Sequence, residues 1–141
     1  MSFIRFPALL GVACVCWSAA AAASARSQDA DATALRNPVP ATSESVAAGA
    51  ASYGKMCALC HGATGAGDGK LAAATAAYGA RPSDLTDDKW SHGSSDGEIF
   101  KVIRDGIEPD FNMPGFKGRL SDTEIWNVVN YVRSLGPRSF R

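Results

Sequence analysis

Residues 57–61 read Cys-Ala-Leu-Cys-His, and a glycine-rich stretch, GATGAGDG, follows at residues 62–69. Two cysteines separated by two residues, with a histidine directly after the second, form the CxxCH pattern by which a c-type haem is attached. Each thiol can form a thioether with one vinyl group of the porphyrin, and the adjacent imidazole can then bind the iron. The pattern therefore predicts one covalently bound haem c, held by Cys57, Cys60 and His61, with His61 as an iron ligand.

Three other kinds of site use similar residues, and the surrounding sequence argues against each. A thioredoxin-like redox pair places its CxxC at the start of a helix that follows a strand, whereas a helical pattern precedes this pair. A structural zinc site needs four ligands, and only His92 remains downstream to join the motif, so an acidic residue would have to complete the shell. A phosphate-binding loop needs Ser or Thr after its lysine, but Leu71 follows Lys70.

A haem that transfers electrons usually has a sixth iron ligand, which is Met or His. Met56 adjoins Cys57 on the attachment side of the ring, so its sulfur cannot reach the opposite face. Met113 lies in the loop FNMPGF, where proline and glycine impose stiffness and tight turns, and we predict it as the sixth ligand. His92 is the alternative ligand, because a neutral imidazole also binds iron; otherwise it is a loop histidine bonded to the backbone or to a haem carboxylate.

Helical patterns flank the motif on both sides. Apolar and small residues spaced three and four apart predict a helix from about residue 45 to the first cysteine. An alanine-rich segment at residues 71–78 predicts a short helix. Two capping boxes, in which a serine precedes a glutamate by three residues, predict helices that end at glycines; the pairs are Ser95 with Glu98, before Gly106, and Ser121 with Glu124, before Gly136.

No segment shows the alternation of period two that is typical of strands, so we predict an all-α fold with three to four short helices and long loops. Loops of a dozen or more residues are uncommon in compact domains unless something functional orders them. A large, flat apolar cofactor at the centre would supply the buried area that the short helices lack. The fold prediction and the haem prediction therefore support each other.

The first 25 residues have the features of a secretory signal peptide. Arg5 precedes an apolar run at residues 6–23 that ends in small residues, and we predict cleavage after Ala25. An uncleaved membrane anchor is the alternative, because about 20 apolar residues can span a bilayer. A lipoprotein attached at Cys14 has less support, since Gly11 stands where a branched apolar residue is expected. Export through a signal peptide implies a periplasmic protein.

The rest of the chain divides into two parts. Residues 26–43 are polar and alanine-rich with two prolines and are expected to form a flexible leader, and residues 44–137 are expected to form the haem domain. In the chain of 141 residues, 14 Lys and Arg balance 14 Asp and Glu. This balance excludes the strongly basic field that nucleic-acid binding requires. A membrane would be reached only through partners or through an uncleaved signal.

The chain resembles the class I c-type cytochromes over about residues 46–135, through CALCH, the distal MPGF and the two flanking helices. The resemblance implies a cytochrome c fold in which the first and last helices cross, at Gly49 and Tyr53 on one helix and Tyr131 on the other. A glycine at a crossing lets two helix backbones approach closely.

The resemblance also assigns roles around the haem. It implies that the carbonyl of Pro82 accepts a hydrogen bond from the second imidazole nitrogen of His61, which fixes the ring. It implies that Trp90 donates a hydrogen bond to a haem propionate, although a half-buried aromatic residue is an equally good interpretation. Arg81 could pair with a propionate or be an exposed arginine.

A stretch ending in EIWNVVNYVRSL is similar to a bacterial subgroup that serves periplasmic dehydrogenases and terminal oxidases. The implied function is one-electron transfer between redox partners, by a monomer or by a subunit, with no catalytic residue in the chain. Two alternatives are an electron-transfer subunit of a periplasmic dehydrogenase and a ligand-binding or sensor haem with a labile Met113. No ring of lysines is expected around the haem edge, which argues against docking on a strongly acidic partner.

Overall fold

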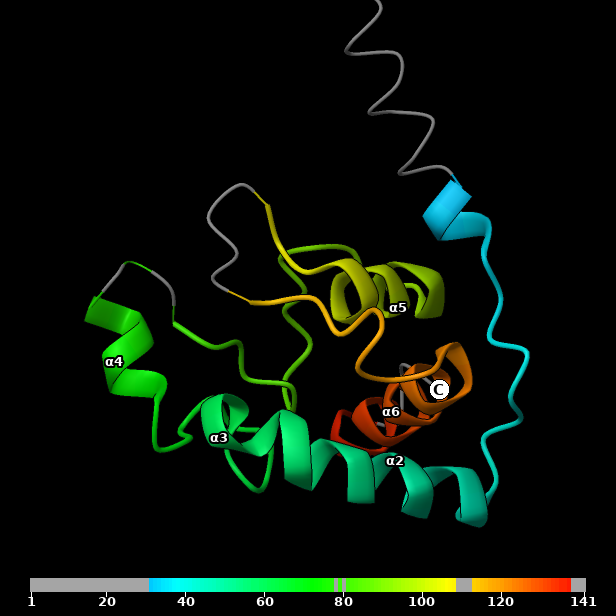
Figure 1. The fold of residues 1–141 in the computed structure, drawn as a ribbon, viewed down its shortest axis with the longest axis horizontal. Helices are drawn as coiled ribbons and strands as arrows, with labels where there is room; N and C mark the ends of the chain where they lie inside the picture. The colour runs from blue at the N-terminus through cyan, green and yellow to red at the C-terminus, as the bar shows by residue number, and fades with distance from the viewer. Residues whose placement is uncertain (1–30, 78, 80, 109–112, 138–141) are drawn as a thin grey trace, which may run out of the picture.

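The computed structural model describes residues 31–77, 79, 81–108 and 113–137 (Figure 1). One helical turn at residues 31–34 is followed by five helices: α2 Ser43–Met56, α3 Ala58–His61, α4 Ala72–Ala77, α5 Asp96–Asp105 and α6 Asp122–Leu135. Isolated bridges between Gly106 and Pro114 and between Lys117 and Leu120 are the only β pairing in this part of the chain. The predicted all-α fold is confirmed, with five helices in the described residues where three to four were predicted, because the CxxCH segment forms a separate turn, α3. Within the described ranges, no helix is both long and apolar enough to cross a membrane.

Helices α2 and α6 cross and pack against each other (Figure 1), and Gly49 of α2 lies where the two backbones come close. A Cβ atom added to Gly49 would lie 2.0 Å from the backbone oxygen of Asn127 and 2.9 Å from Cβ of Tyr131. One turn further along α2, the rings of Tyr53 and Tyr131 pack with their centroids 5.0 Å apart. The predicted crossing through Gly49, Tyr53 and Tyr131 is confirmed, and it depends on the absence of a side chain at residue 49.

We expect Gly49→Ala to destabilise the haem-loaded protein by roughly 1–3 kcal/mol, because the new methyl group must push α6 away from α2. The higher helix propensity of alanine, worth up to about 1 kcal/mol, opposes this loss only in part. Urea unfolding followed by far-UV circular dichroism measures the change. Gly54 is the matched control, since it lies on the same helix with no atom within 4 Å of its added Cβ. Gly54→Ala should leave stability unchanged or raise it, and equal losses for both variants would contradict the crossing argument.

The ends of the two long downstream helices follow from local sequence. Ser95 Oγ accepts from the backbone N–H of Glu98 at 3.2 Å, and Glu98 Oε2 accepts from the N–H of Ser95 at 2.8 Å. Ser121 and Glu124 repeat this arrangement at α6. Both predicted capping boxes are confirmed. Helix α2 begins two residues earlier than expected, because the side chain of Thr42 caps it by accepting from the N–H of Ser45.

The core lies between α2, α5, α6 and the loop that follows α5. Phe100 of α5 stacks on Trp126 of α6 with ring centroids 4.0 Å apart. On α5, Ile99 and Ile103 are buried, and Val102 is half-buried. The other buried hydrophobic residues of this cluster are Tyr53, Cys57, Phe116, Ile125, Val128, Val129 and Val132.

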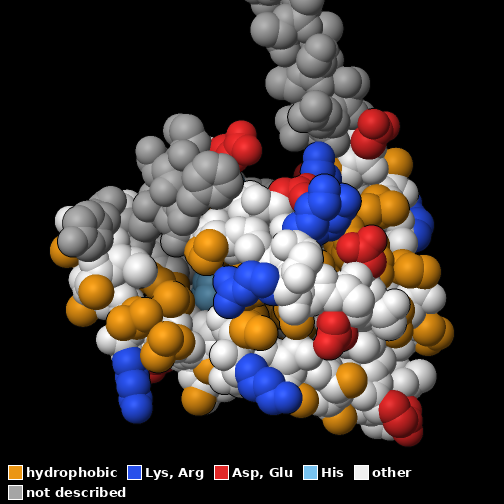
Figure 2. Space-filling model, in the orientation of Figure 1, with side chains coloured by type: hydrophobic (Ala, Val, Ile, Leu, Met, Phe, Trp, Pro, Cys, Tyr) orange, Lys and Arg blue, Asp and Glu red, His pale blue; other side chains and the backbone are white. Residues whose placement is uncertain are grey.

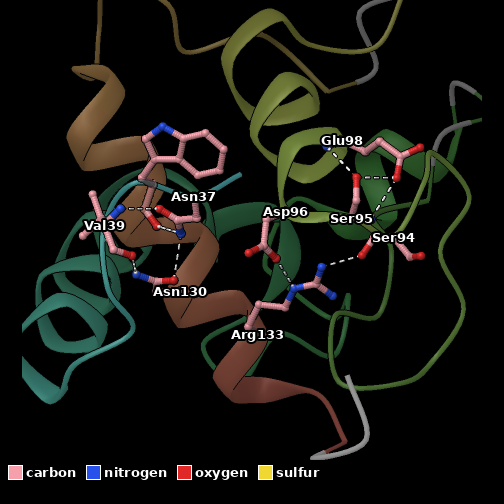
Figure 3. A network of polar contacts seen from close by, with 9 residues as sticks. Asn37, Val39, Ser94, Ser95, Asp96, Glu98, Asn130 and Arg133 are labelled. Atoms are coloured by element: carbon pink, nitrogen blue, oxygen red, sulfur yellow. Dashed lines mark hydrogen bonds and ion pairs between the residues drawn. The ribbon is translucent and has the colours of Figure 1, made fainter. Parts of the chain in front are cut away.

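The flexible leader predicted for residues 26–43 differs from the structure over its described part, residues 31–43, whose last residue begins α2. Asn37 donates to Oδ1 of Asn130 at 2.8 Å, and Nδ2 of Asn130 donates to the carbonyl of Val39 at 3.1 Å (Figure 3). Nδ2 of Asn130 also donates to Oγ of Ser45 at 2.8 Å. Ala32 is buried against Gly97. The polar, proline-containing composition indicated a flexible tether. The partners Asn130 and Gly97 lie more than 60 residues away in the sequence, so composition alone does not reveal these contacts. The predicted signal peptide, residues 1–25, lies outside the described residues.

We expect Asn130→Ala to cost about 1–3 kcal/mol of stability in the haem-loaded protein. The residue is 6% exposed, and its loss removes side-chain hydrogen bonds, among them those to Asn37, Val39 and Ser45. Ser45 keeps its bond to Asn127, so the expected cost is that of the part-buried carbonyl of Val39 and of a weakened Asn37, about 1–3 kcal/mol for a buried group that loses its partner. Thermal unfolding measures the loss, and trypsin cleavage after Arg36 should become faster as the leader detaches. Ser43→Ala, at an exposed position of α2, serves as the control. A variant with unchanged melting and unchanged cleavage would show that the leader contributes nothing.

Candidate functional site

The CxxCH motif occupies the junction between two helices. Helix α2 ends at Met56, Cys57 caps its C-terminus, and α3 adds one turn. The backbone N–H of His61 donates to the carbonyl of Cys57 at 2.9 Å, so the first cysteine and the histidine stand one turn apart. Cys57, Cys60 and His61 all line one cavity of about 430 Å³. The structure therefore brings the three predicted attachment residues together.

The glycine-rich stretch folds back along α3. Backbone N–H groups of Gly67 and Gly69 donate to the carbonyls of His61 and Cys60, at 2.8 Å and 3.1 Å. A Cβ atom on Gly69 would lie 2.4 Å from the carbonyl oxygen of Leu59, so only glycine permits this approach. The hydroxyl of Tyr53 also donates to the carbonyl of Gly62 at 2.8 Å. These bonds hold the motif helix against α2 and satisfy the carbonyls at its end.

The imidazole of His61 is oriented by a backbone carbonyl, but it is not the predicted one. Nδ1 of His61 lies 3.1 Å from the carbonyl oxygen of Ser83, and the assignment of Pro82 to this contact is wrong. The carbonyl of Pro82 is turned towards Gly67, whose added Cβ would lie 2.6 Å from it. Because a carbonyl only accepts, Nδ1 carries the proton, and Nε2 keeps its lone pair for a metal ion. Pro82 still lines the cavity.

Met113 lines the same cavity as His61, together with its neighbours Pro114 and Phe116. The backbone of Met113 is held by the N–H of Ile107, which donates to its carbonyl at 3.0 Å. Phe116 is anchored to the end of α5 by its N–H, which donates to the carbonyl of Ile103 at 3.0 Å. The loop after α5 thus forms one wall of the cavity, and Met113 is half-buried there.

Trp90, His92 and Arg81 also line the cavity, on the loop between α4 and α5. The indole Nε1 of Trp90 is buried and has no hydrogen-bond partner among the described residues. A buried donor without an acceptor costs about 1–3 kcal/mol, so this atom fits a group in the cavity that has an acceptor at its edge. His92 and Arg81 are exposed. A large apolar group with acidic substituents, bound through Cys57 and Cys60, would suit this lining.

Burial changes the pKa of Cys57, within the motif, and of Tyr53, which packs beside it. It raises the pKa of the Cys57 thiol to about 11, with a smaller contribution from the neighbouring Cys60. It likewise raises the pKa of the Tyr53 hydroxyl well above its ordinary value. Cys57 is therefore a neutral thiol at neutral pH, unlike the low-pKa cysteines of redox enzymes.

A tetrahedral metal shell has no support in the described part of the chain, because no three His, Cys, Asp or Glu side chains there are grouped to hold an ion. Sequence reasoning missed two residues that shape the site. Ser83 has no sequence signal, since only the path of the loop decides which carbonyl meets His61. Arg133 places its guanidinium 5.4 Å from the centroid of the Trp90 ring, and its position on a helix next to Val132 gave no sign of this contact.

Comparison with protein families finds a match to the model described as cytochrome c oxidase, cbb3-type, subunit III, over residues 44–132. Among curated relatives, the FixP subunit of a cbb3-type cytochrome c oxidase from Bradyrhizobium sp. (strain ORS 278) is 33% identical over 90 residues, covering 64% of this chain and 27% of the relative. The CcoP subunit from Azospirillum sp. (strain B510) is 33% identical over 100 residues, covering 71% of this chain and 32% of the relative. The chain therefore spans about a third or less of the length of these relatives.

Among solved structures, a chain of the reducing HAO-like protein complex of Kuenenia stuttgartiensis is similar to this protein. It superposes with a TM-score of 0.62 at 32% identity, over 74% of this chain and 49% of that chain.

Proposed function

Because the chain belongs to the cbb3-type cytochrome c oxidase subunit III family, a family of class I c-type cytochrome domains, we propose that it is an exported one-electron carrier with His61 and Met113 as iron ligands. Covalently bound haem c, with its iron, is the cofactor that membership of this family implies. One observation carries the proposal: Cys57, Cys60, His61 and Met113, from two separate segments, line a single cavity.

Bound haem c supplies a one-electron couple between ferrous and ferric iron, and the chain provides attachment, orientation and a dry environment. Cys57 and Cys60 would form the two thioethers. The bond between Nδ1 of His61 and the carbonyl of Ser83 fixes the imidazole plane and keeps Nε2 available. The thioether sulfur of Met113, on the loop after α5, would be the second ligand, and Met ligation shifts the potential of a haem upwards.

The apolar walls of the cavity limit access of water to the haem. Ile99, Ile103, Phe116 and Val128 are each at most 6% exposed and belong to the lining. In such surroundings a change in iron charge meets little solvent reorganisation, which suits electron transfer. Trp90 would donate its unpaired N–H to a haem propionate. No general acid or base is needed, and we propose no catalytic residue.

The test is the spectrum of the protein produced, with its first 25 residues, in a bacterium that attaches haem c. The expected product keeps its haem on a denaturing gel, is low-spin in the ferric state and does not bind carbon monoxide when ferrous. A product without covalent haem would overturn the proposal. A high-spin ferric spectrum, or binding of carbon monoxide to the untreated ferrous protein, would favour the sensor or ligand-binding alternative.

A second candidate, an electron-transfer subunit of a larger oxidoreductase, is favoured by the relatives, which are oxidase subunits by name. Hydrophobic side chains gather over α4 and beside α3 (Figure 2), and Leu59 and Leu71 are 53% and 42% exposed. Purification from the native source under mild conditions separates the two candidates. A monomer favours the free carrier, whereas co-purification with an oxidase or a periplasmic dehydrogenase favours the subunit.

A further inference from the structure

Among the Lys and Arg side chains of the described residues, Arg133 makes the shortest ion pair. Its side chain is only 15% exposed. Its Nε donates to Oδ1 of Asp96 at 2.7 Å, and a terminal nitrogen donates to the carbonyl of Ser94 (Figure 3). The last turns of α6 are thereby joined to the beginning of α5. The ion pair of Arg104 with Asp122 is longer, at 3.7 Å, and each of its side chains is more exposed than its counterpart in the pair of Arg133 with Asp96.

The fixed guanidinium packs on the ring of Trp90, with 5.4 Å from its central carbon to the ring centroid. This distance is within the range of cation–π contact. Trp90 belongs to the segment 81–94, which contains no helix or strand and supplies many of the residues that line the cavity. His61 contacts the beginning of this segment at Ser83, and Arg133 contacts its end at Trp90 and Ser94.

Two observations explain why the contact of Arg133 with Trp90 can affect the cavity. The Nε1 of Trp90 is buried without a partner in the described part of the chain, and the same residue both lines the cavity and contacts the guanidinium, whereas Arg133 does not line the cavity. The orientation of the N–H depends on the ring plane, and the ring plane depends on what packs against it. Asp96 offsets the charge of Arg133, so the arginine acts on the cavity mainly through this packing.

We propose that Arg133 is a positioning residue for the haem: held by Asp96 and Ser94, its guanidinium keeps the Trp90 ring in the plane that directs its N–H into the cavity, and thereby raises the reduction potential. This inference rests on the proposed function. A hydrogen bond from Trp90 to a haem carboxylate reduces the negative charge that the carboxylate presents to the iron, which disfavours the ferric state.

The experiment compares the reduction potentials of haem-loaded variants. Arg133→Gln should lower the ratio of ferrous to ferric protein, at a fixed ambient potential, by a factor of roughly 3 to 10, the size of the net contribution of one hydrogen bond. Trp90→Phe should lower the ratio by a similar factor. In the Trp90→Phe background, Arg133→Gln should add almost nothing, because both changes remove the same interaction.

Asp96→Asn separates positioning from a direct electrostatic effect. Loss of a nearby negative charge would raise the ferrous fraction if charge alone acted, whereas a loosened Arg133 should lower it. The matched control is Arg104→Gln. Arg104 also lies beside an aromatic ring, with 6.0 Å from its central carbon to the centroid of Phe100, but the Phe100 ring, unlike Trp90, does not line the cavity. The potential of Arg104→Gln should equal that of the wild type.

Three results would overturn the inference. One is an unchanged potential in Arg133→Gln, and the second is an undiminished effect of Arg133→Gln in the Trp90→Phe background. The third is a rise in the ferrous fraction of Asp96→Asn. If Arg133→Gln does not accumulate, Arg133→Lys and Asp96→Asn carry the test, because lysine keeps the charge but cannot reproduce the planar fork. Wild-type protein without covalent haem would instead overturn the proposed function, and the inference with it.

Discussion

Replacing Met113 by leucine should abolish the far-red absorption band that sulfur-to-iron coordination produces in ferric cytochromes. Leucine nearly matches the volume of methionine, so the wall of the cavity at Met113 stays filled while the sulfur is lost. The potential should fall by on the order of 0.1 V or more, within the span of about 0.8 V over which axial ligands set haem potentials. The ferrous variant should also bind carbon monoxide, because one coordination position becomes open.

His92→Gln is the matched comparison, since His92 lines the same cavity and is the alternative ligand. It should leave the far-red band and the potential close to those of the wild type. A far-red band that survives in Met113→Leu would exclude Met113 as the sixth ligand. A wild-type spectrum without that band, together with a new open position in His92→Gln, would identify His92 as the ligand.

The features that sequence alone predicted well are those set by neighbours in the chain. In a capping box such as Ser95 with Glu98, the interacting residues are three positions apart, so the local sequence alone determines the geometry. The residues Cys57, Cys60 and His61 of the CxxCH motif lie within a single helical turn, so their spacing in the sequence already brings them together. Gly49 could be recognised because a glycine inside an otherwise good helix needs a reason, and close approach of another helix supplies it.

The features that sequence missed depend on where distant segments meet. A difference of one residue in the path of the loop decides whether Pro82 or Ser83 faces His61, and no propensity distinguishes these paths. The leader looked flexible because Asn37 and Asn130 are far apart in the chain, although they form a hydrogen bond of 2.8 Å. In the sequence, Arg133 looks like an ordinary charged residue near the end of a helix, and only the fold brings it into contact with Trp90.

Replacing both Cys57 and Cys60 by alanine should unfold much of the domain once any loosely bound haem has been removed. The cavity that these residues line has a volume of about 430 Å³. At about 24 cal/mol per Å³, a closed, dry cavity of this size would cost roughly 10 kcal/mol, which is the upper limit here because exposed residues such as His92 line the cavity and water can enter it. Half of that upper limit would equal the lower end of the total stability of about 5–15 kcal/mol that domains possess.

The expected result is loss of the cooperative thermal transition and of most helical circular dichroism in the double variant. The single variant Cys60→Ala is the control, because it keeps one thioether at Cys57 and the ligand His61, and it should remain folded with haem attached. Gly49, Asn127 and Tyr131, where α2 and α6 approach most closely, do not line the cavity, so residual helix should come from this pair. A double variant that melts cooperatively without haem would show that packing between helices alone stabilises the fold, and that the haem serves electron transfer only.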